Sequence, residues 1–197
     1  MDLPETGTDV RSADWDGREM SGEEHEATAF IDVDMTEATG RGVTFRACVF
    51  RGVRFNAAAF RESAFVNCAF VRCSFFDAAF TGCKFLGAAF DDCAFGLLRA
   101  EGGDWSLSRF PGADLSGASF TGVRLREADL SGANCDGATL RDCDLSGATV
   151  RTATLRETDL RGSDLGGVDL LHAELKGVRI DPYQAAVVAT AFGFDVT

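Results

Sequence analysis

The sequence has few of the residues and motifs that mark enzymes. It contains only two histidines, and neither His25 nor His172 lies near a cysteine cluster with the spacing of a metal site. Neither a glycine-rich phosphate-binding loop nor a nucleophile paired with a base is recognisable. These absences argue against an enzyme, and we expect neither a cofactor nor a metal.

Long apolar runs and excess positive charge are missing as well. No run of roughly 18 apolar residues and no secretory leader occurs, so we expect a cytoplasmic protein without a membrane partner. The chain has 19 Lys and Arg against 31 Asp and Glu, a net charge of −12. Neutralising phosphates needs a basic surface, so direct binding of nucleic acid is disfavoured and a basic protein partner is favoured.

Phenylalanine, by contrast, is abundant and regularly spaced, with 17 residues against one tyrosine. From Phe45 to Ile180 a large apolar residue recurs at nearly every fifth position, mostly as Leu from Leu115 onward. Two residues earlier stands a small residue such as Cys48 or Ala58, and two residues later Gly is common. A period of five fits neither a helix nor a flat strand. One such unit cannot bury its own apolar residue, so the pattern predicts a solenoid of stacked units.

The sequence Ala-Asp-Leu-Ser-Gly occurs at residues 113–117 and again at 128–132, and the same register runs through most of the chain. This small-x-large-x-Gly pattern resembles that of the pentapeptide repeat family. The resemblance implies an all-β solenoid, a right-handed quadrilateral β-helix in which four pentapeptides form one coil. Residues 20 apart should then stack at the ~4.8 Å spacing of paired strands, which aligns Phe50, Phe70 and Phe90 in one ladder.

We divide the chain into three parts. Residues 1–27 are acidic and expected to be a largely disordered tail, although weak echoes of the register at Trp15 and Met20 would also fit a ragged first coil. Residues 28–180 form the β-helix, and residues 181–197 form a C-terminal helix and tail. The repeat weakens over 96–104, where Ala100 replaces the expected Phe. This stretch is either a distorted coil or a projecting loop that binds a partner. The candidate partner loop would present Leu97, Leu98, Arg99, Glu101 and Asp104.

The seven cysteines all occupy inward positions of the repeat. We expect buried free thiols that act as small apolar residues. Stacking would bring Cys73 and Cys93 close enough for a disulfide, but a reducing cytoplasm argues against one.

The C-terminal segment has the signals of a short helix. Asp181 suits the N-cap, Pro182 the first helical position and Gly193 the C-terminal cap. This apolar helix either only covers the open end of the solenoid or also forms a two-fold homodimer, which we favour. The expected dimer interface consists of Ile180, Tyr183, Val187, Val188, Phe192, Phe194 and Val196.

This segment, Asp-Pro-Tyr-Gln-Ala-Ala and then Phe-Gly-Phe-Asp-Val, is similar to the C terminus of Qnr-type and MfpA-like pentapeptide repeat proteins. The resemblance implies a dimer joined at its C termini, mimicry of B-DNA in shape and charge, and binding to type II topoisomerase. It also implies protection of DNA gyrase from quinolones or other gyrase poisons. The pair of loops typical of Qnr proteins cannot be located, which makes the MfpA-like form the closer analogy.

Charge mimicry of DNA must be local. Residues from 41 onward hold 19 acids and 17 bases, a net charge of −2, whereas B-DNA of the expected rod length carries about 22 charges. The candidate gyrase-facing residues are acids that precede central apolar positions in the C-terminal half. They are Asp114, Asp129, Asp144, Asp159, Asp164, Asp169 and Glu174. Alternatively, these carboxylates only bind corner amides.

Two functions are therefore compatible with the sequence. The first is a non-enzymatic DNA mimic that binds DNA gyrase and protects it from inhibition. The second is a general protein-binding scaffold with another partner, supported by apolar residues at outward positions. These residues are Val66, Val71, Phe76 and Leu86.

Overall fold

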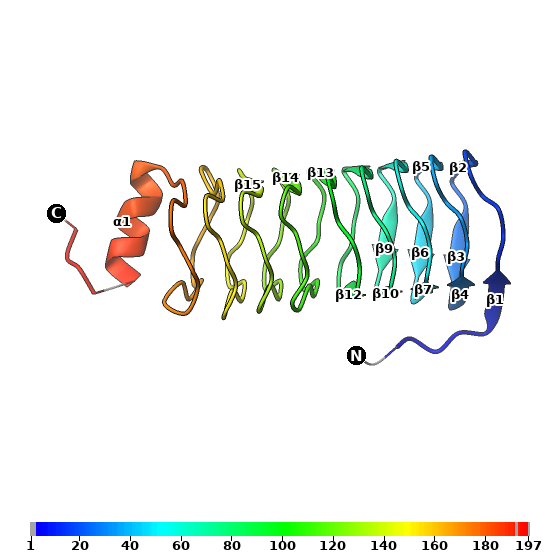
Figure 1. Cartoon of the computed structure of the whole chain (residues 1–197), viewed down its shortest axis with the longest axis horizontal. Coiled ribbons are helices and arrows are strands. Elements are labelled where there is room, and N and C mark those ends of the chain that lie inside the picture. The colour runs from blue at the N-terminus through cyan, green and yellow to red at the C-terminus, as the bar shows by residue number, and fades with distance from the viewer. Residues whose placement is uncertain (1–2, 192, 197) are drawn as a thin grey trace.

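The computed structural model describes residues 3–191 and 193–196, which form a four-sided β-solenoid closed at one end by a helix (Figure 1). The fold class expected from the five-residue repeat is therefore confirmed. The elements are β1 (Thr8–Arg11), β2 (Glu19–Ser21), β3 (Glu24–Glu26), β4 (Thr28–Ile31), β5 (Thr39–Arg41), β6 (Thr44–Arg46), β7 (Val49–Arg51), β8 (Ala59–Arg61), β9 (Ala64–Val66), β10 (Ala69–Val71), β11 (Ala79–Thr81), β12 (Ala89–Asp91), β13 (Arg99–Glu101), β14 (Ser119–Thr121), β15 (Thr139–Arg141) and α1 (Pro182–Ala191).

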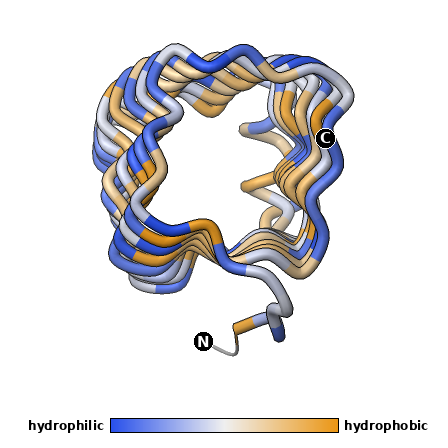
Figure 2. Tube along the Cα trace, turned by 90° about the vertical axis from the view of Figure 1, so that its right-hand side faces the viewer, coloured by the Kyte–Doolittle hydropathy of each residue, from blue (hydrophilic) through white to orange (hydrophobic). Residues whose placement is uncertain are grey.

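Every strand pairs in parallel with strands one coil away. One sheet runs β1-β4-β7-β10-β12, a second runs β15-β14-β13-β11-β8-β5-β2 and a third runs β3-β6-β9. The fourth side is joined by isolated bridges, from Asp14–Asp34 to Thr154–Glu174. We name these the β1 side, β2 side, β3 side and bridge side. In chain order a coil passes the β1 side (residues 8–12), the bridge side (13–17), the β2 side (18–22) and the β3 side (23–27), and Figure 2 shows the square section that results.

The core is a set of aromatic ladders that follow from this register. Phe50, Phe70 and Phe90 stack with ring centroids 4.8 Å apart and planes within 10° of parallel. Rings on neighbouring sides meet edge to face, as Phe45 and Phe50 do at 72°. The coil spacing imposes the parallel stacking, and the square corner imposes the edge-to-face contacts. Both arrangements suit the quadrupoles of aromatic rings. Toward the C terminus, buried leucines such as Leu115 take over these positions.

The prediction that the chain is largely disordered before residue 28 was wrong. Residues 8–27 form a complete first coil, in which β1 pairs with β4 and aligns Val10 with Phe30. Trp15 and Met20 continue the inward register, and Met20 is almost fully buried. Most of the acids that suggested a disordered tail occupy outward positions, as Asp14 does. There a charge remains solvated, so charge density did not prevent folding.

Residues 96–104 form part of a regular coil and not a projecting loop. β13 pairs in register with β11 and β14, which aligns Ala100 with Phe80 and Phe120. The volume missing at Ala100 is filled by Trp105, whose ring lies edge to face against Phe80 and Phe120 at centroid distances of 6.0 and 5.4 Å. Leu98 adds a large buried side chain where the repeat usually has a small residue. Compensation within one coil therefore preserves the solenoid.

Glycine is required at one point of this coil. A Cβ on Gly103 would lie 2.0 Å from the carbonyl oxygen of Cys83, and the residue has a φ of +87°. Gly103 therefore allows a close backbone approach that other residues would prevent.

Candidate partner-binding surfaces

The C-terminal end is closed by a hydrogen-bonded cap on α1. The Asp181 carboxylate accepts a hydrogen bond from the Gln184 backbone amide at 2.9 Å. The Gln184 side-chain oxygen accepts in return from the Asp181 backbone amide at 2.8 Å. The Gln184 side-chain amide also donates to the carbonyl oxygens of Leu160 and Ser163, at 2.6 and 2.7 Å. This reciprocal capping box starts the helix and satisfies carbonyls of the last coils. The bond from the Gln184 backbone amide, together with a second from the Gly162 amide at 3.0 Å, lowers the pKa of Asp181.

The expected dimer residues fall into two groups. Ile180 and Val188 pack partly against the core, and Val187 is half-buried. Tyr183, Phe194 and Val196 are exposed, with Tyr183 79% accessible. Phe192 lies outside the described residues. The exposed group leaves apolar surface at this end of the rod, whereas Ile180 and Val188 already support the fold.

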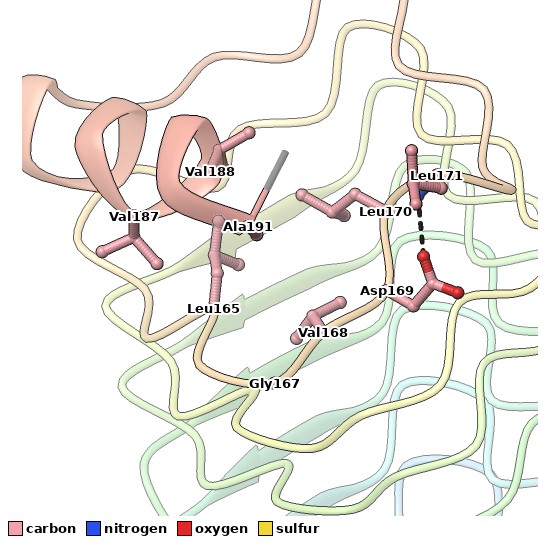
Figure 3. Close-up of a pocket in the computed structure, with 9 residues that line it drawn as sticks. All are labelled: Leu165, Gly167, Val168, Asp169, Leu170, Leu171, Val187, Val188 and Ala191. Carbon is pink, nitrogen blue, oxygen red and sulfur yellow. Dashed lines mark hydrogen bonds between the residues drawn. The ribbon is translucent and has the colours of Figure 1, made fainter. Parts of the chain in front are cut away.

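A hollow of about 280 Å³ lies between α1 and the last coils (Figure 3). Leu165, Val168 and Leu170 line it from the solenoid, and Val187 and Ala191 line it from the helix. Asp169 stands at its edge, where its carboxylate accepts from the Leu171 amide at 3.0 Å. The helix therefore covers the solenoid end incompletely and leaves an apolar recess beside the exposed C-terminal residues.

The seven candidate gyrase-facing acids do not form one surface. Asp129 and Asp169 lie on the β1 side, Asp114 and Glu174 on the bridge side, Asp159 on the β2 side, and Asp144 and Asp164 on the β3 side. The sequence pattern placed all seven before central apolar residues. Successive repeats turn to successive sides, so among acids at this position of the repeat only those whose numbers differ by multiples of 20 share a side.

Several of these carboxylates do bind corner amides. Asp129 accepts from Ser131 at 2.9 Å, Asp164 from Gly166 at 2.9 Å and Asp114 from Ser116 at 3.0 Å. Each such bond uses Oδ1 and reaches the amide two residues onward, which is the geometry of an Asx turn. A structural role for these residues is thus visible, and it leaves the other carboxylate oxygen available.

Asp159 is unsuited to a partner-facing role. It is only 5% exposed. Its carboxylate accepts two bonds from the Arg161 guanidinium, at 2.7 and 2.8 Å, and this pairing lowers the pKa of Asp159 to about 2. Its charge is therefore neutralised within the β2 side.

The bridge side carries the strongest charge imbalance, which sequence reasoning missed. Between residues 7 and 180 it has nine acids and three bases, whereas the β2 side has five acids and seven bases. The bridge-side acids are Asp14, Asp16, Asp34, Glu37, Asp77, Asp114, Asp136, Glu157 and Glu174, and its bases are Arg54, Arg156 and Lys176. Sorting all outward positions by the 20-residue register would have found this side.

The supposed partner loop contributes to an apolar band instead. Leu97 is exposed on the bridge side beside Phe76, and Leu86 and Leu107 are exposed on the opposite β3 side. Leu98 is buried and Ala100 is in the core. Arg99 pairs with Asp77 at 2.7 Å, and Asp104 pairs with Arg124 at 3.0 Å. Glu101 is exposed at the end of β13.

Nothing among the described side chains resembles a metal site. No cluster of three or more His, Cys, Asp or Glu residues is placed to bind a metal within residues 3–191 and 193–196. All seven cysteines are free, and burial raises the pKa of Cys83 and Cys143 to about 11. Across the same residues, no helix is long and apolar enough to cross a membrane.

Comparisons with known proteins identify similar repeats and similar folds. The family model for pentapeptide repeats matches eight copies, over residues 108–147 and 151–181. A trypsin-treated variant of QnrB1, a plasmid-mediated fluoroquinolone resistance protein, is similar with 25% identity and a TM-score of 0.63, covering 98% of this chain and 99% of QnrB1. HetL, a pentapeptide repeat protein involved in heterocyst differentiation regulation from Nostoc sp. strain PCC 7120, shares 22% identity at a TM-score of 0.41, covering 90% of both chains. No match was found among curated proteins.

Proposed function

Since the chain is a pentapeptide repeat protein, we propose that it is a non-enzymatic DNA mimic that binds DNA gyrase or a related type II topoisomerase in the cytoplasm. Binding would protect the enzyme from quinolones or other gyrase poisons, or modulate their effect. The observation that carries this proposal is the near-complete overlap with QnrB1, a fluoroquinolone resistance protein, at 25% identity.

The distribution of charge supports this proposal. The bridge side and the opposite β3 side carry most of the excess acid, with nine acids against three bases and seven against four between residues 7 and 180. DNA-binding surfaces are cationic, so two acidic sides along a narrow rod would be attracted to such a surface over several ångströms. Each of these two sides gathers acids from several coils, whereas the seven acids first expected are spread over all four sides.

A gyrase assay tests the proposal directly. Purified gyrase would be inhibited by a fluoroquinolone in supercoiling and DNA-cleavage reactions, with and without this protein. We expect the protein to raise the drug concentration that inhibits half of the activity and to reduce drug-stabilised cleavage. Gyrase that neither binds the protein nor changes its drug response would overturn the proposal.

We further propose that the chain forms a homodimer through its C-terminal end. Tyr183 near the start of α1 and Phe194 just after its end are exposed, and Val187 between them lines the apolar recess. A two-fold axis would bring two such surfaces together. Light scattering should report a dimer for the parent and a monomer for Tyr183→Glu combined with Phe194→Glu. Leu3→Glu, an exposed apolar residue at the other end, is the matched control. A monomeric parent at micromolar concentration would exclude the dimer.

A second function, a scaffold for a different protein, is favoured by the apolar band. Phe76 and Leu97 on one side and Leu86 and Leu107 on the opposite side are exposed at the same height of the rod. Exposed apolar side chains gathered in this way often mark protein contacts. Should gyrase fail to bind, this band becomes the surface to test.

A further inference from the structure

The two ends of the solenoid differ in how their strand edges are covered. α1 covers the C-terminal end. Within the described residues, β1, β2 and β3 each pair on one edge only, with β4, β5 and β6. Figure 2 looks onto this N-terminal end, where the segment of residues 3–7 leaves the square at a corner and lies outside its outline. The first coil therefore presents a free edge of parallel strands.

The free edge has hydrogen-bond donors on several sides. In later coils, the amide of the residue before each central position donates to a carbonyl one coil earlier. Examples are Asp34 to Ala13 at 3.0 Å and Thr39 to Arg18 at 2.9 Å. The corresponding first-coil amides belong to Asp14, Glu19 and Glu24. Residues 3–7 place no carbonyl against them, so these donors point away from the coil.

An acidic ring surrounds this edge. It consists of Asp9, Asp14, Glu19 and Glu24, one exposed residue on each of the four sides. The ring lies at the same position of the repeat on every side. Asp9 already pairs with Arg11 at 2.7 Å, so the attraction rests mainly on Asp14, Glu19 and Glu24, whose own amides are the free donors. A strand that pairs with this edge would therefore need basic residues on its outward face to match these carboxylates.

The core behind the edge is already covered. Arg18 and Glu23 occupy inward positions that elsewhere hold small residues. The Arg18 guanidinium lies 4.0 Å from the Trp15 ring centroid and 3.0 Å from the Glu23 carboxylate, and the His25 Nε2 lies 3.3 Å from that carboxylate. This polar plug protects the aromatic ladder from water. The end thus offers strand pairing and charge rather than an apolar pocket.

The solenoid itself shows how such a charged strand would pair. Asp34 and Arg54, aligned one coil apart on the bridge side, form an ion pair. Asp104 and Arg124, aligned in the same way on the β3 side, pair at 3.0 Å. In both pairs the base lies one coil after the acid, whereas an added strand would lie before Asp14. A basic residue in register on that strand would be one coil spacing from Asp14, on its other side. Ion pairs of this kind supplement the backbone bonds of an added strand.

We propose that the free edge of the first coil binds an extended, arginine- or lysine-rich segment of a partner protein by strand addition. A second copy of this chain is disfavoured, because two acidic rings would face each other. This binding does not depend on the proposed gyrase function and uses the opposite end from the dimer.

The probe is a synthetic peptide that copies residues 49–56, Val-Phe-Arg-Gly-Val-Arg-Phe-Asn, which in the fold runs beside the strand of Asp34. It is titrated into isotope-labelled full-length protein, and amide resonances are followed by NMR. We expect shifts concentrated at Asp14, Glu19, Glu24 and their neighbours. A peptide with both arginines replaced by glutamate should cause none.

Two variants with equal charge change separate specific pairing from general attraction. Neutralising the acidic ring (Asp9→Asn, Asp14→Asn, Glu19→Gln, Glu24→Gln) should weaken peptide binding about tenfold or more. Neutralising four other exposed or half-buried acids (Asp91→Asn, Asp92→Asn, Glu101→Gln, Asp142→Asn) should change it by about twofold at most.

Three results would overturn the proposal. One is an equal loss in both variants, and another is a set of shifts spread over other coils. The third is a parent protein whose resonances do not shift at millimolar peptide. If the ring-neutralised variant also self-associates in that case, the acidic ring serves only to prevent other strands from pairing with the edge.

Discussion

A residue's position within the five-residue repeat decides whether it supports the core or faces solvent. Phe70 at a central position is fully buried between Phe50 and Phe90, whereas Phe76, one residue after a central position, is 53% exposed. The two residues have the same side chain and lie six positions apart. Their replacement therefore compares buried and exposed phenylalanine within one protein.

We expect Phe70→Ala to lower the free energy of unfolding by about 3–5 kcal/mol, because the neighbouring coils cannot close the cavity it leaves. Phe76→Ala, the matched control, should cost less than about 1 kcal/mol. Urea denaturation followed by circular dichroism measures both. Equal stability of Phe70→Ala and the parent would contradict the stacked core.

Restoring the repeat at Ala100 should destabilise the protein. Trp105 and Leu98 already fill the space between Phe80 and Phe120, so Ala100→Phe overpacks this coil at a cost of about 1–3 kcal/mol. Adding Trp105→Leu should recover most of that loss, and a double-mutant cycle in urea measures the coupling. An Ala100→Phe variant more stable than the parent would show that the coil has unused space.

Among the elements, α1 depends on polar contacts to the last coils as well as on apolar packing. Its end signals, Asp181, Pro182 and Gly193, could be predicted from the sequence, because capping preferences are local. The buried role of Gln184 could not, since it depends on which carbonyls of the solenoid face the helix. The one sequence signal for this role was the presence of a single glutamine in an otherwise apolar helix.

Gln184→Leu should cost about 2–3 kcal/mol, because it leaves the Ser163 carbonyl without a donor and removes half of the capping box. The Leu160 carbonyl loses one of its two donors and keeps the Ser163 amide, which lies 3.0 Å away. Hydrogen exchange should show faster opening of the last coils while the first coils stay protected, because repeats contact mainly their neighbours. Thr190→Ala, at an exposed position of α1, is the control and should change stability by less than about 0.5 kcal/mol. Unchanged hydrogen-exchange rates of the last coils in Gln184→Leu would show that Gln184 does not stabilise them.

At the scale of the whole molecule, the repeat fixes the fold, and the 20-residue register decides which outward residues share a side. The first was predictable, because the period of five is strict from Phe45 onward. The continuation to Val10 was not, because His25 and Trp15 replace the usual Phe and acids surround them. That the seven candidate acids lie on four different sides was not apparent from the pattern, because neighbours in the repeat are a quarter turn apart.

The bridge side should therefore contribute more to gyrase binding than an equal charge elsewhere. Neutralising Asp114, Asp136, Glu157 and Glu174 should weaken binding more than neutralising Asp129, Asp144, Asp164 and Asp169, which lie on two other sides. Binding of the parent should weaken as salt rises, because screening acts over about 8–10 Å. Binding measured by surface plasmon resonance, with circular dichroism to check folding, decides this. Equal binding by both variants without salt dependence would exclude electrostatic mimicry.

The register also separates the length of the rod from the angle between its ends. Deleting one whole coil would shorten the rod and leave every later residue on its own side. Deleting a single pentapeptide would keep the inward pattern but turn every later residue to the preceding side. Acids that now continue one row, such as Asp14 and Asp114 on the bridge side, would then lie on adjacent sides. Gain or loss of pentapeptides can thus rotate one half of the charge pattern against the other while the core composition changes little.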